Sequence, residues 1–75
     1  MLIHIGNLIR DELRRQGHTN AWLAERIGVT ERTLQRIYNK ASIDSQQLLR
    51  ISVVLHVDFS VFYSNAYAAM TNVDT

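Results

Sequence analysis

Apolar residues recur at helical spacing near the start of the chain. In residues 5–16 they fall at i, i+3, i+4 and i+8, one stripe along a helix that consists of Ile5, Leu8, Ile9 and Leu13. Gly17 follows where helices commonly end, because glycine adopts a left-handed conformation without steric cost. The pattern predicts a first helix over residues 5–16.

Two shorter helices follow, separated by a tight turn. Thr19 or Asn20 can cap a helix over residues 21–27, in which Leu23, Ala24 and Ile27 share one face. The turn is the tripeptide Gly28-Val29-Thr30. Thr30 can cap a third helix over about residues 31–39, in which Leu34 and Ile37 face inward. Two helices joined in this way form a helix-turn-helix.

The second half of the chain predicts two more helices. Asp44, with Gln47 three residues on, is a variant of the capping box that begins a helix over residues 45–55. We expect that helix to bury Leu48, Leu49, Ile51, Val54 and Leu55. Asp58 can cap a fifth helix from residue 59, whose stripe is Phe59, Phe62, Tyr63, Tyr67 and Met70. We expect Phe59 and Phe62 to close the core of an all-α fold with five helices.

Composition narrows the class of protein. A chain of 75 residues makes one small domain, and the absence of proline with only 3 glycines favours helices. There is no cysteine to form a disulfide or a thiolate metal site, so we expect a reducing, cytoplasmic location. The longest apolar run covers residues 66–70, which excludes a membrane span in the sequence given.

Charge is unevenly distributed. Residues 1–40 hold seven basic and four acidic side chains, a balance of +3, whereas residues 41–75 hold one basic and three acidic side chains, a balance of −2. A basic half can face a polyanion while the acidic half faces away, although chance sampling of fifteen charges gives the same split.

The residues do not favour an enzyme. His4, His18 and His56 are far apart in sequence, and none has a second ligand at i+3 or i+4, as a metal site would need. There is no glycine-rich loop for a phosphate and no order of residues typical of a nucleophilic triad. We therefore predict no catalytic residue, no metal and no cofactor.

The outer face of the third helix suits double-stranded DNA, although an ordinary solvated helix face is the alternative. Arg32 and Arg36 can each donate two parallel hydrogen bonds to guanine, and Gln35 can pair with adenine or reach a phosphate. Glu31 can accept from cytosine or discriminate against a wrong base. Side chains that can hold backbone phosphates flank the helix: Thr30, Asn39 and Lys40.

Residues 19–40 resemble the helix-turn-helix of the phage λ repressor/Cro and xenobiotic-response-element (Xre) family. The matching residues are Leu23-Ala24, Gly28-Val29-Thr30, Thr33-Leu34, Arg36-Ile37 and Asn39. The run Leu48-Leu49-Arg50-Ile51 with Leu55, Phe59 and Phe62 is similar to the family's fourth and fifth helices, so the resemblance spans about residues 5–63.

The resemblance implies a transcriptional regulator, a repressor, that binds operator DNA as a two-fold dimer. By position it adds Thr33 to the base contacts and Asn20 to the backbone contacts. The expected base contacts are then Glu31, Arg32, Thr33, Gln35 and Arg36, and the expected backbone contacts are Asn20, Thr30, Asn39 and Lys40. The sequence departs from the family at Asn20, which is shorter than the usual glutamine, at Trp22, and in the short loop over residues 39–43.

Aromatic residues remain to be explained outside the helix-turn-helix. Trp22 either covers the core where the first two helices meet or contacts a partner. Tyr63, Tyr67 and Met70 lie at or beyond the end of the DNA-binding domain expected over residues 1–63, and one small domain has little core left for them. We expect two copies of the chain to form a homodimer through the extension over residues 64–75. The third helices of the two copies, which would contact the DNA bases, would then lie about 34 Å apart.

A second function class stays open. The same scaffold serves in protein-interaction modules, such as an antitoxin that binds a toxin or an adaptor that has lost DNA binding. The modest net charge of +1, Glu31 in the groove-facing position and the aromatic C-terminal stripe favour this alternative.

Overall fold

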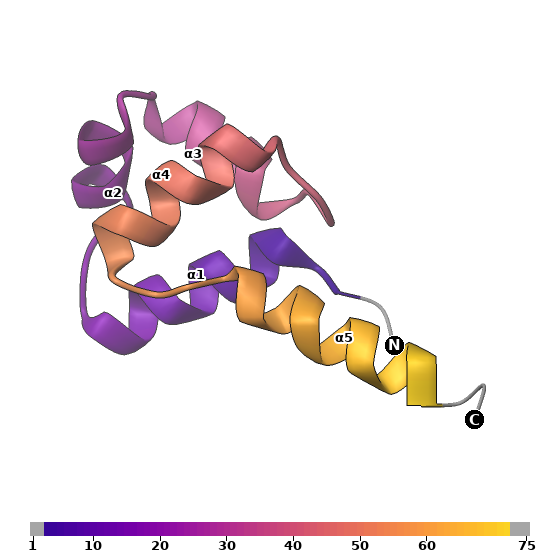
Figure 1. Ribbon diagram of the computed structural model, residues 1–75. Helices are drawn as coiled ribbons and strands as arrows, with labels where there is room; N and C mark the ends of the chain where they lie inside the picture. The colour runs from indigo at the N-terminus through magenta and orange to yellow at the C-terminus, as the bar shows by residue number, and fades with distance from the viewer. Residues whose placement is uncertain (1–2, 73–75) are drawn as a thin grey trace.

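The computed structural model describes residues 3–72, which contain five α-helices and no strand. The helices are α1 (Ile5–Gln16), α2 (Asn20–Ile27), α3 (Glu31–Tyr38), α4 (Ser45–Leu55) and α5 (Ser60–Asn72) (Figure 1). The expectation of an all-helical chain with five helices is confirmed. None of the helices in this part of the chain is long and apolar enough to cross a membrane.

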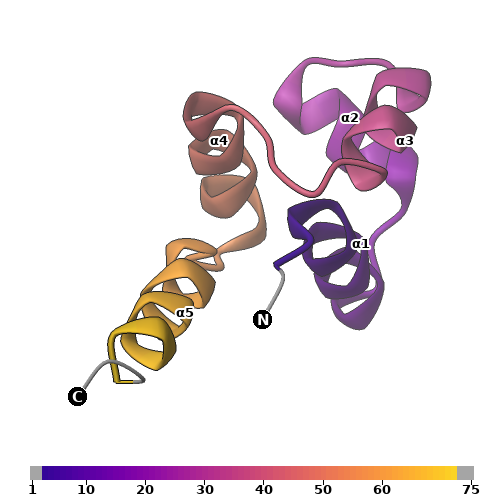
Figure 2. The same ribbon diagram turned by 90° about the vertical axis from the view of Figure 1, so that its right-hand side faces the viewer.

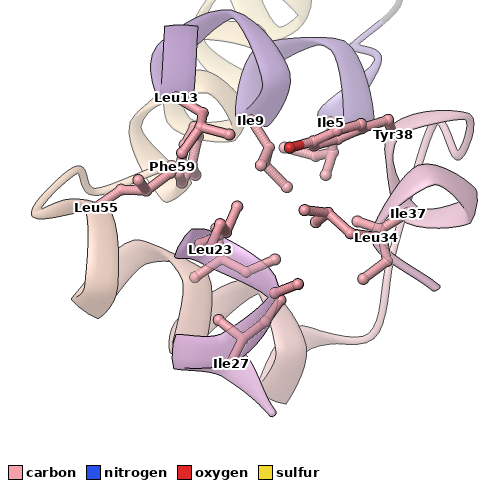
Figure 3. Close-up of a cluster of buried hydrophobic side chains, with 12 residues drawn as sticks. Ile5, Ile9, Leu13, Leu23, Ile27, Leu34, Ile37, Tyr38, Leu55 and Phe59 are labelled. Carbon is pink, nitrogen blue, oxygen red and sulfur yellow. The ribbon is translucent and has the colours of Figure 1, made fainter. Parts of the chain in front are cut away.

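Helices α1 to α4 enclose the core, and α5 projects from it (Figures 1 and 2). The molecule measures 46 × 20 × 20 Å as a result. Twelve apolar side chains are buried in one cluster: Ile5, Ile9, Leu13, Leu23, Ala24, Ile27, Leu34, Ile37, Tyr38, Ile51, Leu55 and Phe59 (Figure 3). Phe59 joins the cluster from the residue before α5, and Phe62 in the first turn of α5 is half-buried against it, so the core extends only to the base of that helix.

The turns follow the capping residues of the sequence. Gly17 and Gly28 end α1 and α2 with φ of 79° and 75°, where a side chain would be strained. Thr19 and Thr30 begin α2 and α3, and each hydroxyl accepts a hydrogen bond from the backbone N–H three residues on. The resulting order, α2, a three-residue turn and α3, is the one that the sequence predicts.

Several boundaries and one cap differ from expectation. The helix α2 begins one residue earlier, at Asn20, because Thr19 is its cap, and α3 ends one residue earlier, at Tyr38. The fifth helix begins at Ser60 rather than Phe59. Asp44 forms no side-chain hydrogen bond to α4, so the predicted capping box is wrong.

Leu49 is not part of the core, contrary to the prediction. It is 65% exposed, whereas Ile51 and Leu55 of the same helix are buried. The helix α4 packs against α1 and α2 on one side only, and Leu49 lies on the other side. Leu48 and Val54 are half-buried at the edges of the packed face.

Trp22 covers the edge of the core, which supports the first of its two interpretations. Its ring stacks on His18, with centroids 3.6 Å apart and planes 3° from parallel. The guanidinium of Arg26 lies 4.6 Å from the Trp22 ring centroid, close enough for a cation–π interaction. The three side chains follow one another at four-residue intervals, from the loop before α2 to its last turn.

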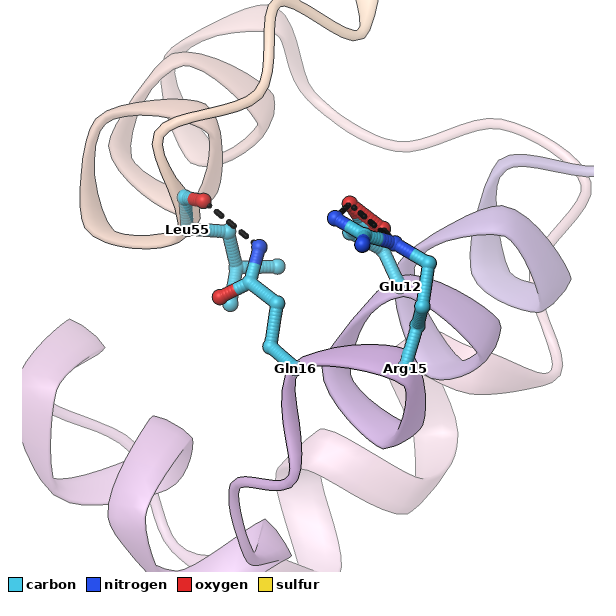
Figure 4. A network of polar contacts seen from close by, with 4 residues as sticks. All are labelled: Glu12, Arg15, Gln16 and Leu55. Atoms are coloured by element: carbon cyan, nitrogen blue, oxygen red, sulfur yellow. Dashed lines mark hydrogen bonds and ion pairs between the residues drawn. The ribbon is translucent and has the colours of Figure 1, made fainter.

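Polar contacts also join the helix ends. Gln16 at the end of α1 donates through Nε2 to the carbonyl oxygen of Leu55 at the end of α4, at 2.8 Å (Figure 4). Arg50 of α4 donates to the carbonyl oxygen of Ile27 at the end of α2, at 3.4 Å. Both acceptors lie in a last helical turn, where carbonyl groups lack partners within the helix.

Candidate nucleic-acid interface

The helix α3 has one buried and one exposed face. Leu34, Ile37 and Tyr38 point into the core. The polar side chains of the opposite face are exposed and share one surface: Glu31, Arg32, Gln35 and Arg36. Asn39 and Lys40, directly after the helix, are exposed as well. The arrangement brings six of the nine predicted DNA contacts to the outer side of α3 and its C-terminal end.

The basic groups of this surface are not neutralised by neighbouring acids. Within residues 3–72 the ion pairs are Arg10–Asp11 at 3.5 Å and Arg15–Glu12 at 2.6 Å, both on α1. The Arg15–Glu12 pair is bidentate, since Nε and Nη2 each donate to the carboxylate, and it lowers the pKa of Glu12 (Figure 4). Arg32, Arg36 and Lys40 form no ion pair in the described part of the chain.

Thr30 and Thr33 are joined to each other at the start of α3. The Thr30 hydroxyl accepts from the backbone N–H of Thr33 and donates to the Thr33 hydroxyl, both at 3.1 Å. Thr33 is half-buried. The two side chains therefore fix the first turn of α3, which carries Glu31 and Arg32.

Asn20 is tied to the other end of α3. Its Oδ1 accepts a hydrogen bond of 2.9 Å from the hydroxyl of Tyr38, which is only 3% exposed. Burial raises the pKa of Tyr38, which keeps the phenol protonated as a donor. The amide nitrogen of Asn20 donates to no group within residues 3–72, so it remains available as a donor.

The backbone after α3 is held by the start of α1. The N–H groups of Ile5 and Gly6 donate to the carbonyl oxygens of Ala41 and Lys40, both at 2.9 Å. A side chain on Gly6 would overlap the carbonyl oxygen of Tyr38, so only glycine allows α1 to approach this closely. The segment that carries Lys40 is thereby fixed to a helix more than thirty residues away in sequence.

Sequence reasoning missed Gly6 and Tyr38. Tyr38 continues the stripe of Leu34 and Ile37 at i+4, so helical periodicity contained its signal. Gly6 gives no local signal, because it lies inside a helix where glycine has no conformational use, and its role depends on a neighbour distant in sequence.

No family model, curated protein or solved structure matches the chain. In the described part of the chain, no group of three or more His, Asp or Glu side chains could hold a metal ion.

The residues predicted to form a dimer lie apart from the α3 surface. Tyr63, Tyr67 and Met70 are 41%, 70% and 68% exposed on α5. In both ribbon views α5 points away from α3 (Figures 1 and 2). The segment expected over residues 64–75 is a helix as far as Asn72, and its last three residues lie outside the described part of the chain.

Proposed function

We propose that this chain binds double-stranded DNA through α2 and α3 as a helix-turn-helix transcriptional regulator, with α3 in the major groove. The proposal rests above all on Arg32 and Arg36, which are exposed on one helix face and carry no intramolecular ion pair in residues 3–72. A paired arginine must break its own contacts before it binds a base, whereas an unpaired one does not. The α3 arginines thus differ from Arg15, whose guanidinium group is already hydrogen-bonded to the carboxylate of Glu12.

Each residue has a proposed role. Arg32 and Arg36 read guanine, Gln35 reads adenine, and Glu31 accepts from cytosine. Thr33 supports the base contacts through the first turn of α3, which its bonds to Thr30 hold in place. Backbone phosphates are held by Asn20, Thr30, Asn39 and Lys40.

We propose that the regulator acts as a repressor and binds as a two-fold dimer. In a two-fold dimer, the α3 helices of the two subunits would each bind one half-site, and the two half-sites would lie about 34 Å apart. The exposed apolar side chains of α5 support self-association at a distance from the α3 surface.

The decisive experiment is selection of binding sites from genomic fragments with the purified protein, followed by affinity measurements at several salt concentrations. Lys40 is the one cationic side chain among the four proposed phosphate contacts of each subunit, so log K should fall against log salt with a slope of about −2 per dimer, and more steeply where Arg32 or Arg36 also neutralises a phosphate. A pair of inverted half-sites is expected among the selected fragments. Failure to enrich any fragment, or affinity that does not change with salt, would overturn the proposal.

Single substitutions separate base reading from phosphate binding. Arg32→Ala or Arg36→Ala should cost about 1–3 kcal/mol on the selected site and relax preference at one base position. Lys40→Ala should weaken binding to all DNA sequences alike and reduce the slope of log K against log salt by about 1 per subunit. Arg15→Ala is the matched control, because that arginine is exposed and paired on α1, and it should leave affinity unchanged.

A protein-interaction module, such as an antitoxin or an adaptor, is the second candidate. The observation that favours it is α5, which has no charged residue and exposes Tyr67 and Met70. Its test is co-purification of the chain at native expression level. A stoichiometric small protein partner, together with no enriched DNA fragment, would favour this function over the first.

A further inference from the structure

A groove follows α4 on the side where this helix packs against α2 (Figure 1). It consists of two hollows of about 560 and 500 Å³, which share Val53 and Val54. The stretch of α4 that lines them, from Gln46 to His56, corresponds to about 15 Å. We call the two hollows together the α2–α4 groove, and the side chains that matter for binding are Trp22, Arg26, Leu49, Arg50, Val53 and Val54.

The middle of the α2–α4 groove is apolar. Leu49 and Val53 are 65% and 63% exposed and lie one turn apart on α4. Val54, which is half-buried at the edge of the core, lines both hollows with Val53. Exposed branched apolar side chains gain free energy when a partner covers them, and apolar patches with a polar rim mark interaction sites.

The charged groups of the α2–α4 groove are basic. Arg26 of α2 and Arg50 of α4 are exposed, and neither forms an ion pair within residues 3–72. His18 and His56 line the same hollow as Arg26. No Asp or Glu of the described residues lines either hollow. A partner that approaches the groove therefore meets positive charge around an apolar middle.

Trp22 and Arg26 are held in position before any partner binds. The Trp22 ring stacks on His18, and the guanidinium of Arg26 lies 4.6 Å from the centroid of that ring. Tryptophan and arginine are the side chains that most often dominate the binding energy of protein interfaces. Because the stacked side chains are already ordered, they lose less conformational entropy when a partner binds.

We propose that the α2–α4 groove binds an acidic amphipathic helix of another protein. Apolar residues of that helix, at i, i+3 or i+4 and i+7, pack on Leu49, Val53 and Trp22. Carboxylates beside them pair with Arg26 and Arg50. Three turns of helix cover the length of the groove. The proposal goes beyond DNA binding and does not depend on it, because no residue of α3 lines either hollow.

Charge and shape favour this occupant over the others. Two-fold pairing of the groove with itself would bring two basic surfaces together, and α5 of a second copy has no acidic residue for Arg26 or Arg50. Phosphates of DNA gain nothing from Leu49 and Val53. Both hollows are open to solvent, whereas sites for small molecules enclose most of the ligand.

Selection from a library of random peptides of about 16 residues, against the full chain, tests the proposal. The enriched peptides should be rich in Asp and Glu and carry Leu, Ile or Phe at i, i+3 or i+4 and i+7. Trp22 is the single tryptophan of the chain, so a peptide without tryptophan that binds in the groove should change its fluorescence. Failure to enrich any peptide, or enrichment of peptides without acidic residues, would overturn the proposal.

Charge exchange with the best selected peptide separates direct contact from structural damage. Arg26→Glu should raise the peptide Kd about tenfold or more, and a peptide with lysine in place of its carboxylates should bind this variant better than the wild type. Arg14→Glu is the matched control, because Arg14 is exposed on α1 and lines neither hollow. An equal loss in both variants would show attraction by net charge alone and would contradict the proposal.

The apolar contact is tested in the same assay. Val53→Ser should raise the peptide Kd about tenfold, whereas Val61→Ser, 46% exposed on α5, should leave it within about twofold. Circular dichroism verifies that each variant remains folded. A chain that enriches no acidic peptide, but whose self-association in sedimentation velocity is weakened by Val53→Ser, would assign the groove to a second copy instead. Peptide binding by a chain that selects no DNA fragment would refute the proposed function and leave this inference intact.

Discussion

The helices α3 and α5 both present large side chains to solvent, but they are held in opposite ways. The helix α3 is fixed at its start by Thr30, at its end by the Tyr38–Asn20 bond, and just beyond by the backbone contacts with α1. The helix α5 is attached through Phe59 and Phe62 at its base and has few further contacts. A helix that reads a rigid partner benefits from being held in advance, whereas a helix that pairs with its own copy can gain its order from that pairing.

The chemistry of the two exposed faces differs in the same sense. The face of α3 carries Arg32 and Arg36, whose charged groups are exposed to water. The α5 face carries Tyr67 and Met70, which lose water favourably against any apolar surface. One small chain thus separates an exposed charged face on α3 from an exposed apolar face on α5.

The largest effect that we expect is on the anchoring of α3, from Gly6→Ala. The new Cβ would overlap the carbonyl oxygen of Tyr38 and push α1 from the end of α3. The free energy of unfolding should fall by about 3 kcal/mol, as in overpacked interiors. Urea denaturation followed by Trp22 fluorescence measures it. Gly17→Ala is the control, because a Cβ added there would meet no other atom within 4 Å. Its free energy of unfolding should fall by about 1 kcal/mol, the cost of the left-handed backbone alone. Equal losses in the two variants would mean that α1 and α3 do not approach closely.

The next largest effect is expected from Tyr38→Phe, which removes the hydrogen bond between the Tyr38 hydroxyl and Asn20 at the end of α3. Loss of the bond to Asn20 should lower the free energy of unfolding by about 1 kcal/mol at pH 7. Since burial raises the pKa of Tyr38, the folded chain keeps a proton that the unfolded chain releases above about pH 10. The stabilisation is therefore complete below pH 10 and is lost as the pH rises through the raised pKa.

The difference in free energy of unfolding between the wild type and Tyr38→Phe should accordingly become smaller from pH 7 to pH 10 and pH 11, as measured by urea titrations. Tyr67→Phe, compared at a protein concentration at which the chain is monomeric, is the matched control, because the Tyr67 side chain is 70% exposed and loss of its hydroxyl should change neither the free energy of unfolding nor its pH dependence. A gap that stays constant into the alkaline range would show that the phenol of Tyr38 is not buried in solution.

The contrast between the two helices also separates what the sequence predicts from what it does not. Helical periodicity and the glycines at 17 and 28 determine where α1 to α3 begin and end within a residue, since caps and turns are local. The outward position of Arg32 and Arg36 follows from the inward position of Leu34 and Ile37 on the same helix. The fold class and the exposed α3 face could thus be predicted.

Contacts between distant segments could not. The burial of Leu49 was predicted from its apolar character, but burial requires a helix on that side of α4, and α5 projects elsewhere. The bond between Asn20 and Tyr38 and the close approach at Gly6 join residues 18 or more positions apart. No local pattern contains these distances, so the anchoring of the candidate interface emerges only from the structure.

Removing the first-turn cap of each helix compares their coupling to the core. Thr30→Ala should lower the free energy of unfolding by about 1 kcal/mol, because α3 is part of the cooperative core. The same denaturation curves, followed by Trp22 fluorescence, measure it. Thr30→Ser keeps the hydroxyl and should restore most of the loss.

The smallest effect is expected at the start of α5, from Asp58→Ala. The carboxylate of Asp58 accepts a hydrogen bond of 3.0 Å from the backbone N–H of Ser60. Because the helix beyond Phe62 is barely coupled to the core, global unfolding should change by less than about 0.5 kcal/mol. Far-ultraviolet circular dichroism at low concentration should instead lose helical signal, and the loss should diminish as concentration rises and a second copy covers α5. A loss in global stability as large as that of Thr30→Ala would mean that α5 is anchored like α3.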